Sequence, residues 1–357
     1  MNTSIDAMAV DTDRPRAPRA APHATHTFKL LLRREFWEHK GGFLWAPLIA
    51  GAIFLLFSLL GGGAGQLAFL RHADKTMQIN GREIAITEVN WGELLSSASP
   101  NDLRQLHDFI NGMTMLSASW PLLVFGFVGF FYLLGCLYDE RKDRSVLFWK
   151  SLPVSDRDTV LSKLGTALVV GPLLATGIGF ATMLGFGLIV SAFLLFNGAN
   201  PFTLYWAQLD LPLLLGTMLS WIPMYILWAL PTAGWLLLCS AWAKSKPFLW
   251  AILLPVFAGL LVSWFDLLRF VRLDSSWFWE HIVARLLTSA WPGSHLLGMI
   301  DDSTMEVASR DGLDLSTLAG KLAATDLLAN PSLWIGAAAG VVMILAAIRL
   351  RRWRDEG

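Results

Sequence analysis

Charge is scarce in this sequence of 357 residues. Asp, Glu, Lys and Arg together make up 16% of it, against roughly 25% in an ordinary soluble domain. The 28 basic and 28 acidic residues cancel, so the chain has no overall field that would attract nucleic acid. Its two cysteines, Cys136 and Cys239, fall near the ends of apolar runs, which favours free thiols over a disulfide framework.

Motifs for catalysis and cofactor binding are missing as well. The sequence contains no GxxxxGK[ST] phosphate-binding loop, no HExxH zinc motif and no GxSxG nucleophile motif. The histidines with a nearby acid, His72 with Asp74 and His107 with Asp108, are typical of solvated surface pairs rather than metal ligands. We therefore expect a chain that is not an enzyme and that itself binds neither a metal nor a cofactor.

Long apolar runs are what the sequence does contain, because 54% of its residues are hydrophobic. A charge-free run of about 17–25 apolar residues can span a bilayer, and six runs qualify: 43–60, 120–137, 164–196, 211–243, 247–265 and 333–348. The third and fourth exceed what a bilayer requires, so their helices should tilt or extend beyond the lipid. The sequence thus predicts an all-α polytopic membrane protein of six transmembrane helices over residues 27–357, after a disordered tail over residues 1–26.

Ionisable side chains are absent from the middle of these six runs. Ion-coupled transporters usually hold their coupling ion with such groups, although each costs roughly 2.5–3.5 kcal/mol at membrane depth. Three prolines, Pro172, Pro223 and Pro231, fall in the third and fourth runs. They predict packed kinks or, alternatively, broken helices whose backbone could coordinate an ion.

The distribution of Lys and Arg predicts the orientation. With six spans, the two termini and the segments 138–163 and 244–246 share one side and carry 19 of these residues. The other side carries 9, although it holds more of the chain. Because Lys and Arg concentrate in cytoplasmic loops, we expect both termini and the 138–163 segment to face the cytoplasm.

A short helix is predicted just before the first span. Phe28, Leu32 and Phe36 fall on one helical stripe, and Arg33 and Arg34 lie off it. That arrangement is typical of an interfacial helix on the inner membrane surface. The alternative is a simple positive flank that fixes the orientation.

The segments on the outer side also contain structure. Asn80-Gly81, between alternating apolar residues over 76–87, predicts a small β-hairpin. Ser99, followed by a proline, should begin a helix that Gly112 ends. Farther on, the stretch WFWEHIVARLLTSAW at 277–291 is rich in tryptophan, which indicates a helix at the outer interface or one that dips back into the membrane.

The 138–163 segment combines charge, aromatic residues and a proline. Glu140 and Arg144 are spaced i, i+4, which favours a helix that continues from the second span. Pro153 should stop that helix, and Ser155 begins the next one in a capping-box pattern. Between them stand bulky apolar residues: Leu147, Phe148, Trp149 and Leu152. These residues either sit among lipid headgroups beside a solvated charged flank, or they form a surface for a partner.

The order of these features resembles the first cytoplasmic loop of the permeases of type-2 ABC (ATP-binding cassette) transporters. In this sequence the family's loop pattern reads Glu140, Ser145-Val146-Leu147, Leu152-Pro153-Val154-Ser155, Arg157 and Lys163. Many members have Gly-Thr where this chain has Ser-Val, and Asp156 is inserted before the basic residue. The six spans, the interfacial helix and the long outer segment before the last span are similar too, so the resemblance covers most of the chain.

The resemblance implies a permease subunit of a bacterial ABC exporter in the inner membrane. It would work as a dimer of permeases with two ATPase subunits, which carry the ATP and Mg²⁺. The loop would insert into the ATPase through Phe148, Trp149 and Leu152 as buried anchors. The polar rim of that contact, which sets partner choice, would comprise Asp139, Glu140, Arg141, Lys142 and Arg144, and the coupling set would add Leu147, Pro153 and Arg157.

Two alternatives stay open at the level of sequence. One is an ion-coupled secondary transporter that needs no ATPase, and the other is a membrane scaffold or assembly factor without transport. The abundance of Trp, Phe and Gly in the spans suits an amphipathic or lipid-like cargo.

Overall fold

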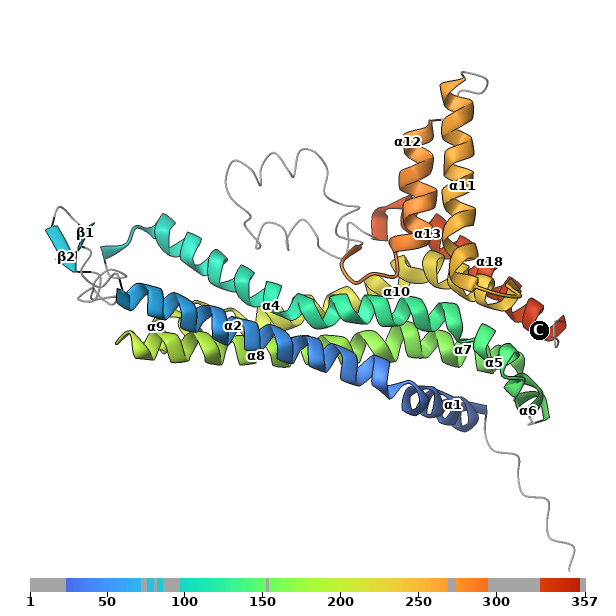
Figure 1. Cartoon of the computed structure of the whole chain (residues 1–357), viewed down its shortest axis with the longest axis horizontal. Helices are drawn as coiled ribbons and strands as arrows, with labels where there is room; N and C mark the ends of the chain where they lie inside the picture. The colour runs from blue at the N-terminus through green and yellow to red at the C-terminus, as the bar shows by residue number, and fades with distance from the viewer. Residues whose placement is uncertain are drawn as a thin grey trace, which may run out of the picture.

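The computed structural model of the chain describes residues 24–71, 76–79, 82–85, 97–151, 154–268, 274–294 and 328–353. The tail expected over residues 1–26 lies outside them, except for residues 24–26, which begin the first helix. In the labels of Figure 1, the elements are α1 (Ala24–Glu38), α2 (Ala46–Arg71), β1 (Thr76–Ile79), β2 (Arg82–Ala85), α4 (Pro100–Gly135), α5 (Tyr138–Lys142), α6 (Ser145–Ser151), α7 (Asp156–Gly165), α8 (Gly171–Phe196), α9 (Pro201–Leu204), α10 (Leu211–Trp242), α11 (Pro247–Leu267), α12 (Ser275–Phe278), α13 (Arg285–Thr288) and α18 (Pro331–Trp353). Short π-helical turns lead into α2 and α8 and join α12 to α13, at Gly41–Trp45, Thr166–Val170 and Trp279–Ala284.

Six helices among the described residues are long and apolar enough to cross a membrane: Gly41–Ala68, Pro100–Lys142, Asp156–Phe196, Pro201–Trp242, Pro247–Leu267 and Pro331–Trp353. Each coincides with one of the six predicted apolar runs, so the predicted spans are confirmed. Their outer faces carry exposed apolar side chains such as Phe57, Leu188 and Val342, which suits contact with lipid rather than water. The chain is therefore a predominantly helical protein with six candidate membrane-spanning segments.

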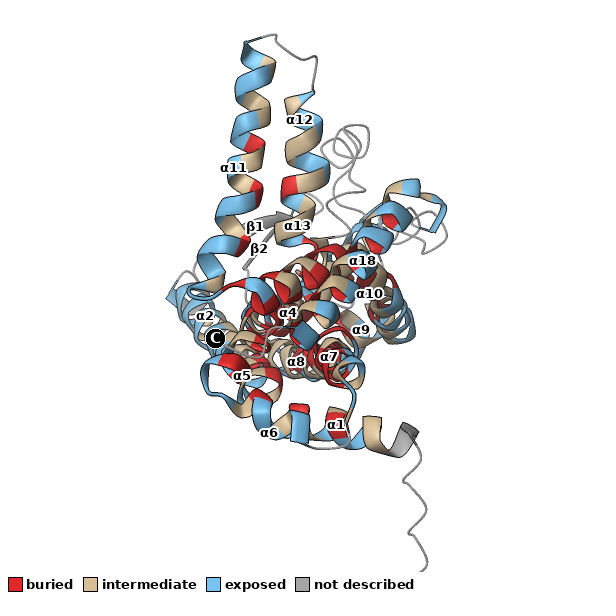
Figure 2. Ribbon diagram, turned by 90° about the vertical axis from the view of Figure 1, so that its right-hand side faces the viewer, coloured by how far each residue is buried: buried red, intermediate tan, exposed pale blue. Residues whose placement is uncertain are grey.

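The molecule is elongated, and its two ends differ (Figure 1). Helices α2, α4 and α8 pack side by side along its length. The β1–β2 hairpin lies at one end, whereas α1, α5, α6, α7 and the C-terminal end of α18 gather at the other, which we call the α6 end. Figure 2 looks along the bundle and shows buried residues concentrated where α4, α7, α8 and α10 meet.

The closest helix pair joins α10 to the last helix, α18. Glycines let the two backbones touch, as small residues do in membrane helices. A Cβ added at Gly234 would lie 2.5 Å from the carbonyl oxygen of Gly340, and one added at Gly340 would lie 2.4 Å from that of Leu230. The last span is thereby fixed on α10 although roughly ninety residues of chain separate them.

The segment after α11 packs along α11 and then turns back toward the bundle. Helices α11 and α12 stand away from the other helices in both views (Figures 1 and 2), and Trp279 Nε1 donates a 2.8 Å hydrogen bond to Ser263 Oγ. Beyond α13, the Trp291 ring meets Phe127 of α4 edge-on, with ring centroids 4.2 Å apart. We call residues 274–294 the re-entrant segment, and its end contacts α4 at Gly126 and Phe127, in the C-terminal third of that helix.

The β-hairpin prediction is confirmed, but the outer helix that starts near Ser99 does not stop where predicted. The two strands pair antiparallel on either side of residues 80–81. Ser99 caps α4 in a capping box with Asp102. The helix then passes through Gly112 and continues to Gly135, because Asn111 is held by hydrogen bonds to Gln208 O and from the Asp210 amide. These contacts outweigh the roughly 1 kcal/mol helix penalty of glycine.

The three prolines do not break their helices. Helix α10 is continuous from Leu211 to Trp242 through Pro223 and Pro231, so the broken-helix alternative does not hold for these two residues. Pro172 lies in the first turn of α8, directly after the π-helical turn Thr166–Val170. A π-helical turn shifts the hydrogen-bond register and so accommodates the amide that proline lacks.

Candidate functional site

The helix from the second span does not continue through residues 143–144, contrary to the i, i+4 prediction. Helix α5 ends at Lys142 and α6 begins at Ser145. Arg144 has φ of +57°, a left-handed conformation that a helix cannot include. The physical reason is the direction of Glu140, which turns inward to bases on α7 and α18 and leaves Arg144 without its expected partner.

Helix α6 presents an apolar tip at the end of the molecule. Leu147 and Phe148 are 56% and 60% exposed, while Val146 is buried beneath them. Trp149 is only half-exposed, because the guanidinium of Arg34 lies 3.4 Å from its ring centroid. The chain then reaches α7, where Ser155 Oγ accepts a hydrogen bond from the Asp158 amide, as the capping-box pattern predicts.

Beneath this tip lies a buried ion network made of Glu35, Glu140, Asp156, Lys163 and Arg351. Lys163 Nζ lies 2.9 Å from a carboxylate oxygen of both Glu35 and Glu140. Arg351 Nη1 lies 2.6 Å from the other oxygen of Glu140, and its Nε lies 3.2 Å from Asp156. The network therefore joins α1, α5, α7 and α18.

Four of these five charged side chains are almost fully removed from water, whereas the side chain of Asp156 is 27% exposed. Glu35 is 1% exposed, Lys163 2%, Arg351 5% and Glu140 9%. Burial of ions is tolerated only where opposite charges and hydrogen bonds compensate it. The three carboxylates of the network face its two bases, and Arg34 adds a third cation 3.8 Å from Glu35. Arg34 also pairs with Glu38 at 2.9 Å. The hydroxyl of Tyr132 on α4 donates to Glu35 as well, so the buried charges have partners on several helices.

A second set of contacts anchors α5 to the end of α10. Arg141 Nη2 donates to the carbonyl oxygens of Ser240 and Ala243, at 2.6 and 2.9 Å. These carbonyls end a helix, where a cationic donor is favoured. The amides of Leu137 and Tyr138 both donate to Ser240 Oγ. The α4–α5 junction therefore cannot shift without disturbing α10.

The predicted coupling residues differ in exposure, and Trp149 is intermediate. Glu140 and Arg141, two residues of the predicted polar rim, are buried and hold the loop together from inside. Leu152 and Pro153 lie outside the described residues. The structure places the following predicted residues on the exposed surface of the α6 end: Asp139, Lys142, Arg144, Leu147, Phe148 and Arg157.

The predicted helix before the first span exists as α1, but its stripe faces the protein. Phe28, Leu32 and Phe36 are half-buried, and α1 packs on α7. Arg33 is exposed, whereas Arg34 is half-buried over the tryptophan of α6. Sequence reasoning missed the reason for this packing. An acid at position 35, on the apolar side of the helix, was the one signal that a buried partner existed.

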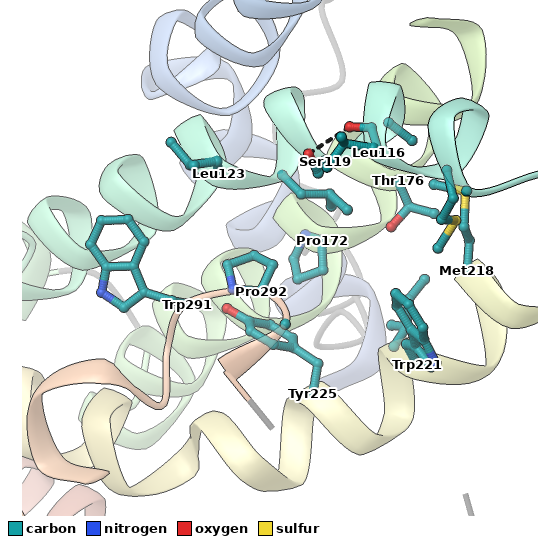
Figure 3. A pocket seen from close by; sticks show the side chains of 16 residues that line it. Leu116, Ser119, Leu123, Pro172, Thr176, Met218, Trp221, Tyr225, Trp291 and Pro292 are labelled. Carbon is teal, nitrogen blue, oxygen red and sulfur yellow. Dashed lines mark hydrogen bonds between the residues drawn. The ribbon is translucent and has the colours of Figure 1, made fainter. Parts of the chain in front are cut away.

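An apolar cavity of about 420 Å³ lies between α4, α8 and α10 (Figure 3). Met115, Leu122, Ile222 and Trp221 line its walls, and Trp291 and Pro292 of the re-entrant segment close one side. Its few polar groups are already bonded within the protein. The Ser119 hydroxyl donates a hydrogen bond to the carbonyl oxygen of Leu116, and the Tyr225 hydroxyl donates one to that of Ala290. A space of this size and lining suits an apolar ligand rather than an ion.

Comparison of the chain with protein-family models, with curated proteins and with solved structures finds no match. The site must therefore be interpreted from its own geometry.

Proposed function

We propose that the chain is the transmembrane permease subunit of an ATP-driven ABC exporter in a bacterial inner membrane. Two copies would work with two ATPase subunits, and the α6 end, with both termini, would face the cytoplasm. The proposal is supported most directly by one observation: an exposed apolar tip on α6 stands on a buried, charge-paired base. Because its base is held in place by ion pairs, such a tip can transmit a force from a partner without being displaced itself.

The connections of α6 make it suitable as a lever. A force on the tip passes through α5 to α4, and through α7 to α8. The buried ion network carries the same force to α1 and α18, because it contains a charged residue from each. Breaking a buried ion pair is expensive, so these elements should move as one body. The tip itself would contribute no catalytic group, since ATP hydrolysis takes place on the partner.

The exposed and buried residues then have different roles. Leu147 and Phe148 would be the anchors that enter a cleft of the ATPase, since apolar residues at the centre of an interface contribute most of its binding energy. The charged residues around them would govern the rate and choice of partner. Trp149 would support the tip from behind, because Arg34 already covers its ring.

Co-purification tests this assignment. The tagged full-length chain, extracted from its native membrane in mild detergent, should carry with it an ATPase in equal amount. Phe148→Ala should weaken that complex about thirtyfold, the loss expected for a hot spot of about 2 kcal/mol. The matched control is Phe196→Ala, since Phe196 is an even more exposed aromatic residue at the far end of α8.

Two results would contradict the proposal: no ATPase accompanies the wild-type chain, or both variants keep it equally. Uphill solute movement by the chain alone in vesicles, abolished by an uncoupler, would instead identify an ion-coupled transporter. A fixed complex with an envelope protein, without ATP hydrolysis, would identify a scaffold.

A further inference from the structure

One arginine lies against two of the candidate membrane-spanning helices without an acidic partner among the described residues. Arg285 begins α13, in the re-entrant segment. Its guanidinium carbon lies 4.2 Å from the ring centroid of Trp228, about halfway along α10. On the other side it meets α18, where a Cβ added at Gly336 would lie only 2.6 Å from it. The half-buried side chain therefore packs against two candidate spans.

The position of this arginine is fixed by its own backbone. Thr232 Oγ1 of α10 donates a 2.8 Å hydrogen bond to the carbonyl oxygen of Arg285, and Ser289 Oγ donates to the same oxygen at 2.7 Å. Gly336 leaves the space that the guanidinium fills. Helix packing thus directs the side chain inward.

The guanidinium is nevertheless left incompletely bonded. Its Nε and Nη2 atoms are buried and have no hydrogen-bond partner. An arginine stays charged and offers five N–H donors. At the α6 end, by contrast, each buried guanidinium has hydrogen-bonded partners: Arg141 Nη2 donates to two carbonyl oxygens, and Arg351 donates to two carboxylates.

The acidic side chains nearest in sequence do not compensate the charge. Asp274 accepts hydrogen bonds from Ser276 and from the Trp277 amide at the start of α12. Glu280 is exposed. A buried donor without a partner in a native structure calls for an explanation, and a missing anion is the direct one.

We propose that Arg285 binds the phosphate oxyanion of an amphipathic ligand whose apolar chain occupies the neighbouring cavity. Guanidinium groups recognise phosphate through paired N–H donors, and they do so more strongly where water is excluded. Residues near Arg285 and near Trp228 in the sequence line the cavity. Tyr225, one helical turn before Trp228 on α10, lines it, and so do Trp291 and Pro292, which follow α13 (Figure 3). The inference goes beyond the proposed function, because it concerns binding and requires no ATPase.

Binding of radiolabelled phosphatidylglycerol to the purified full-length chain in detergent tests this site. Arg285→Gln should weaken binding about tenfold, the effect of losing a charge-assisted hydrogen bond. Arg285→Lys, which keeps the charge but not the fork, should give an intermediate loss. Arg104→Gln, at an exposed arginine of α4, should bind like the wild type.

Two competitors identify the source of the phosphate. Diacylglycerol, which has the chains without the phosphate, should compete poorly and equally in all variants. If inorganic phosphate at millimolar concentration does not compete, the ligand is a lipid; if it does, a free phosphate shares the site, and both results support an oxyanion at Arg285.

The proposal is overturned if the Gln variant binds phosphatidylglycerol as tightly as the wild type. It is also overturned if Arg104→Gln causes an equal loss, or if a crosslink shows an acid of a second copy against Arg285. If gel filtration shows that Arg285→Gln does not fold, the Lys variant decides. Unchanged binding by a folded Arg285→Lys variant would contradict recognition of the phosphate by paired guanidinium N–H donors.

Discussion

Lys163 is the residue on which the buried ion network depends most, because it faces the carboxylates of Glu35 and Glu140 at once. Lys163→Met keeps a side chain of similar length but leaves Glu35 with no basic partner closer than Arg34. Since removing one partner of a buried pair typically costs about 3–5 kcal/mol, the variant should unfold at a clearly lower temperature in detergent.

The control for this change is Lys142→Met, because Lys142 is exposed on α5. An exposed substitution usually changes stability by about 0.5 kcal/mol or less. Thermal unfolding followed by circular dichroism measures both variants. Equal unfolding temperatures for the two would show that the network adds no stability.

The charged residues of this network could be predicted only in part. Glu35 is conspicuous in the sequence because it stands on the apolar side of a short helix. Its partner is 128 positions away, and Arg351 is 211 positions from Glu140, so local spacing contains no information about either pair. Arg285 was missed for a related reason. It lies between two predicted spans in the sequence, and only the tertiary structure brings it against α10 and α18.

Helices α10 and α18 form the contact at which element packing is tightest. In Gly340→Ala, the new methyl group would lie 2.4 Å from the carbonyl oxygen of Leu230, so the two helices must move apart. Overpacking of this kind costs about 1–3 kcal/mol. The unfolding temperature should fall accordingly.

Gly216→Ala is the matched change in the same helix pair, since a Cβ there would meet nothing within 4 Å. Removing a glycine from a helix interior should stabilise α10 by up to about 1 kcal/mol. The two variants should therefore shift the unfolding temperature in opposite directions. A shared direction would mean that the close approach at Gly340 does not limit the packing.

Elements were predictable where their signals are local. The caps at Ser99 and Ser155 need only side chains three residues away, and the hydrophobic spans need only composition. The merging of the outer helix with the second span and the break at Arg144 are both set by partners distant in sequence: Gln208 and Asp210 for the first, and Lys163 and Arg351 for the second.

At the scale of the whole molecule, charge and apolar surface are sorted by position. The ion network and the tip of α6 lie at the α6 end, the apolar cavity lies between the long helices, and Arg285 lies where the re-entrant segment meets α10 and α18. If the chain exports an amphipathic molecule, the α6 end would receive the force from the ATPase. The cavity would hold the apolar chain of the cargo, and Arg285 would contact its headgroup.

The arrangement requires the α6 end and the hairpin end to lie on opposite sides of the membrane. Single cysteines can report this cleanly, because both natural cysteines, Cys136 and Cys239, are buried. Ser151→Cys on α6 and Gln105→Cys near the start of α4 are both at exposed positions. Since Lys and Arg are concentrated on the α6 side, that side should be cytoplasmic.

A membrane-impermeant maleimide applied to intact cells should therefore label Gln105→Cys and leave Ser151→Cys unlabelled until the membrane is permeabilised. The unmodified chain should stay unlabelled in both conditions, which controls for the natural thiols. Labelling of Ser151→Cys in intact cells would reverse the orientation. It would place the apolar tip of α6 where no ATP-hydrolysing subunit could reach it, so this measurement constrains the proposed mechanism without any knowledge of the cargo.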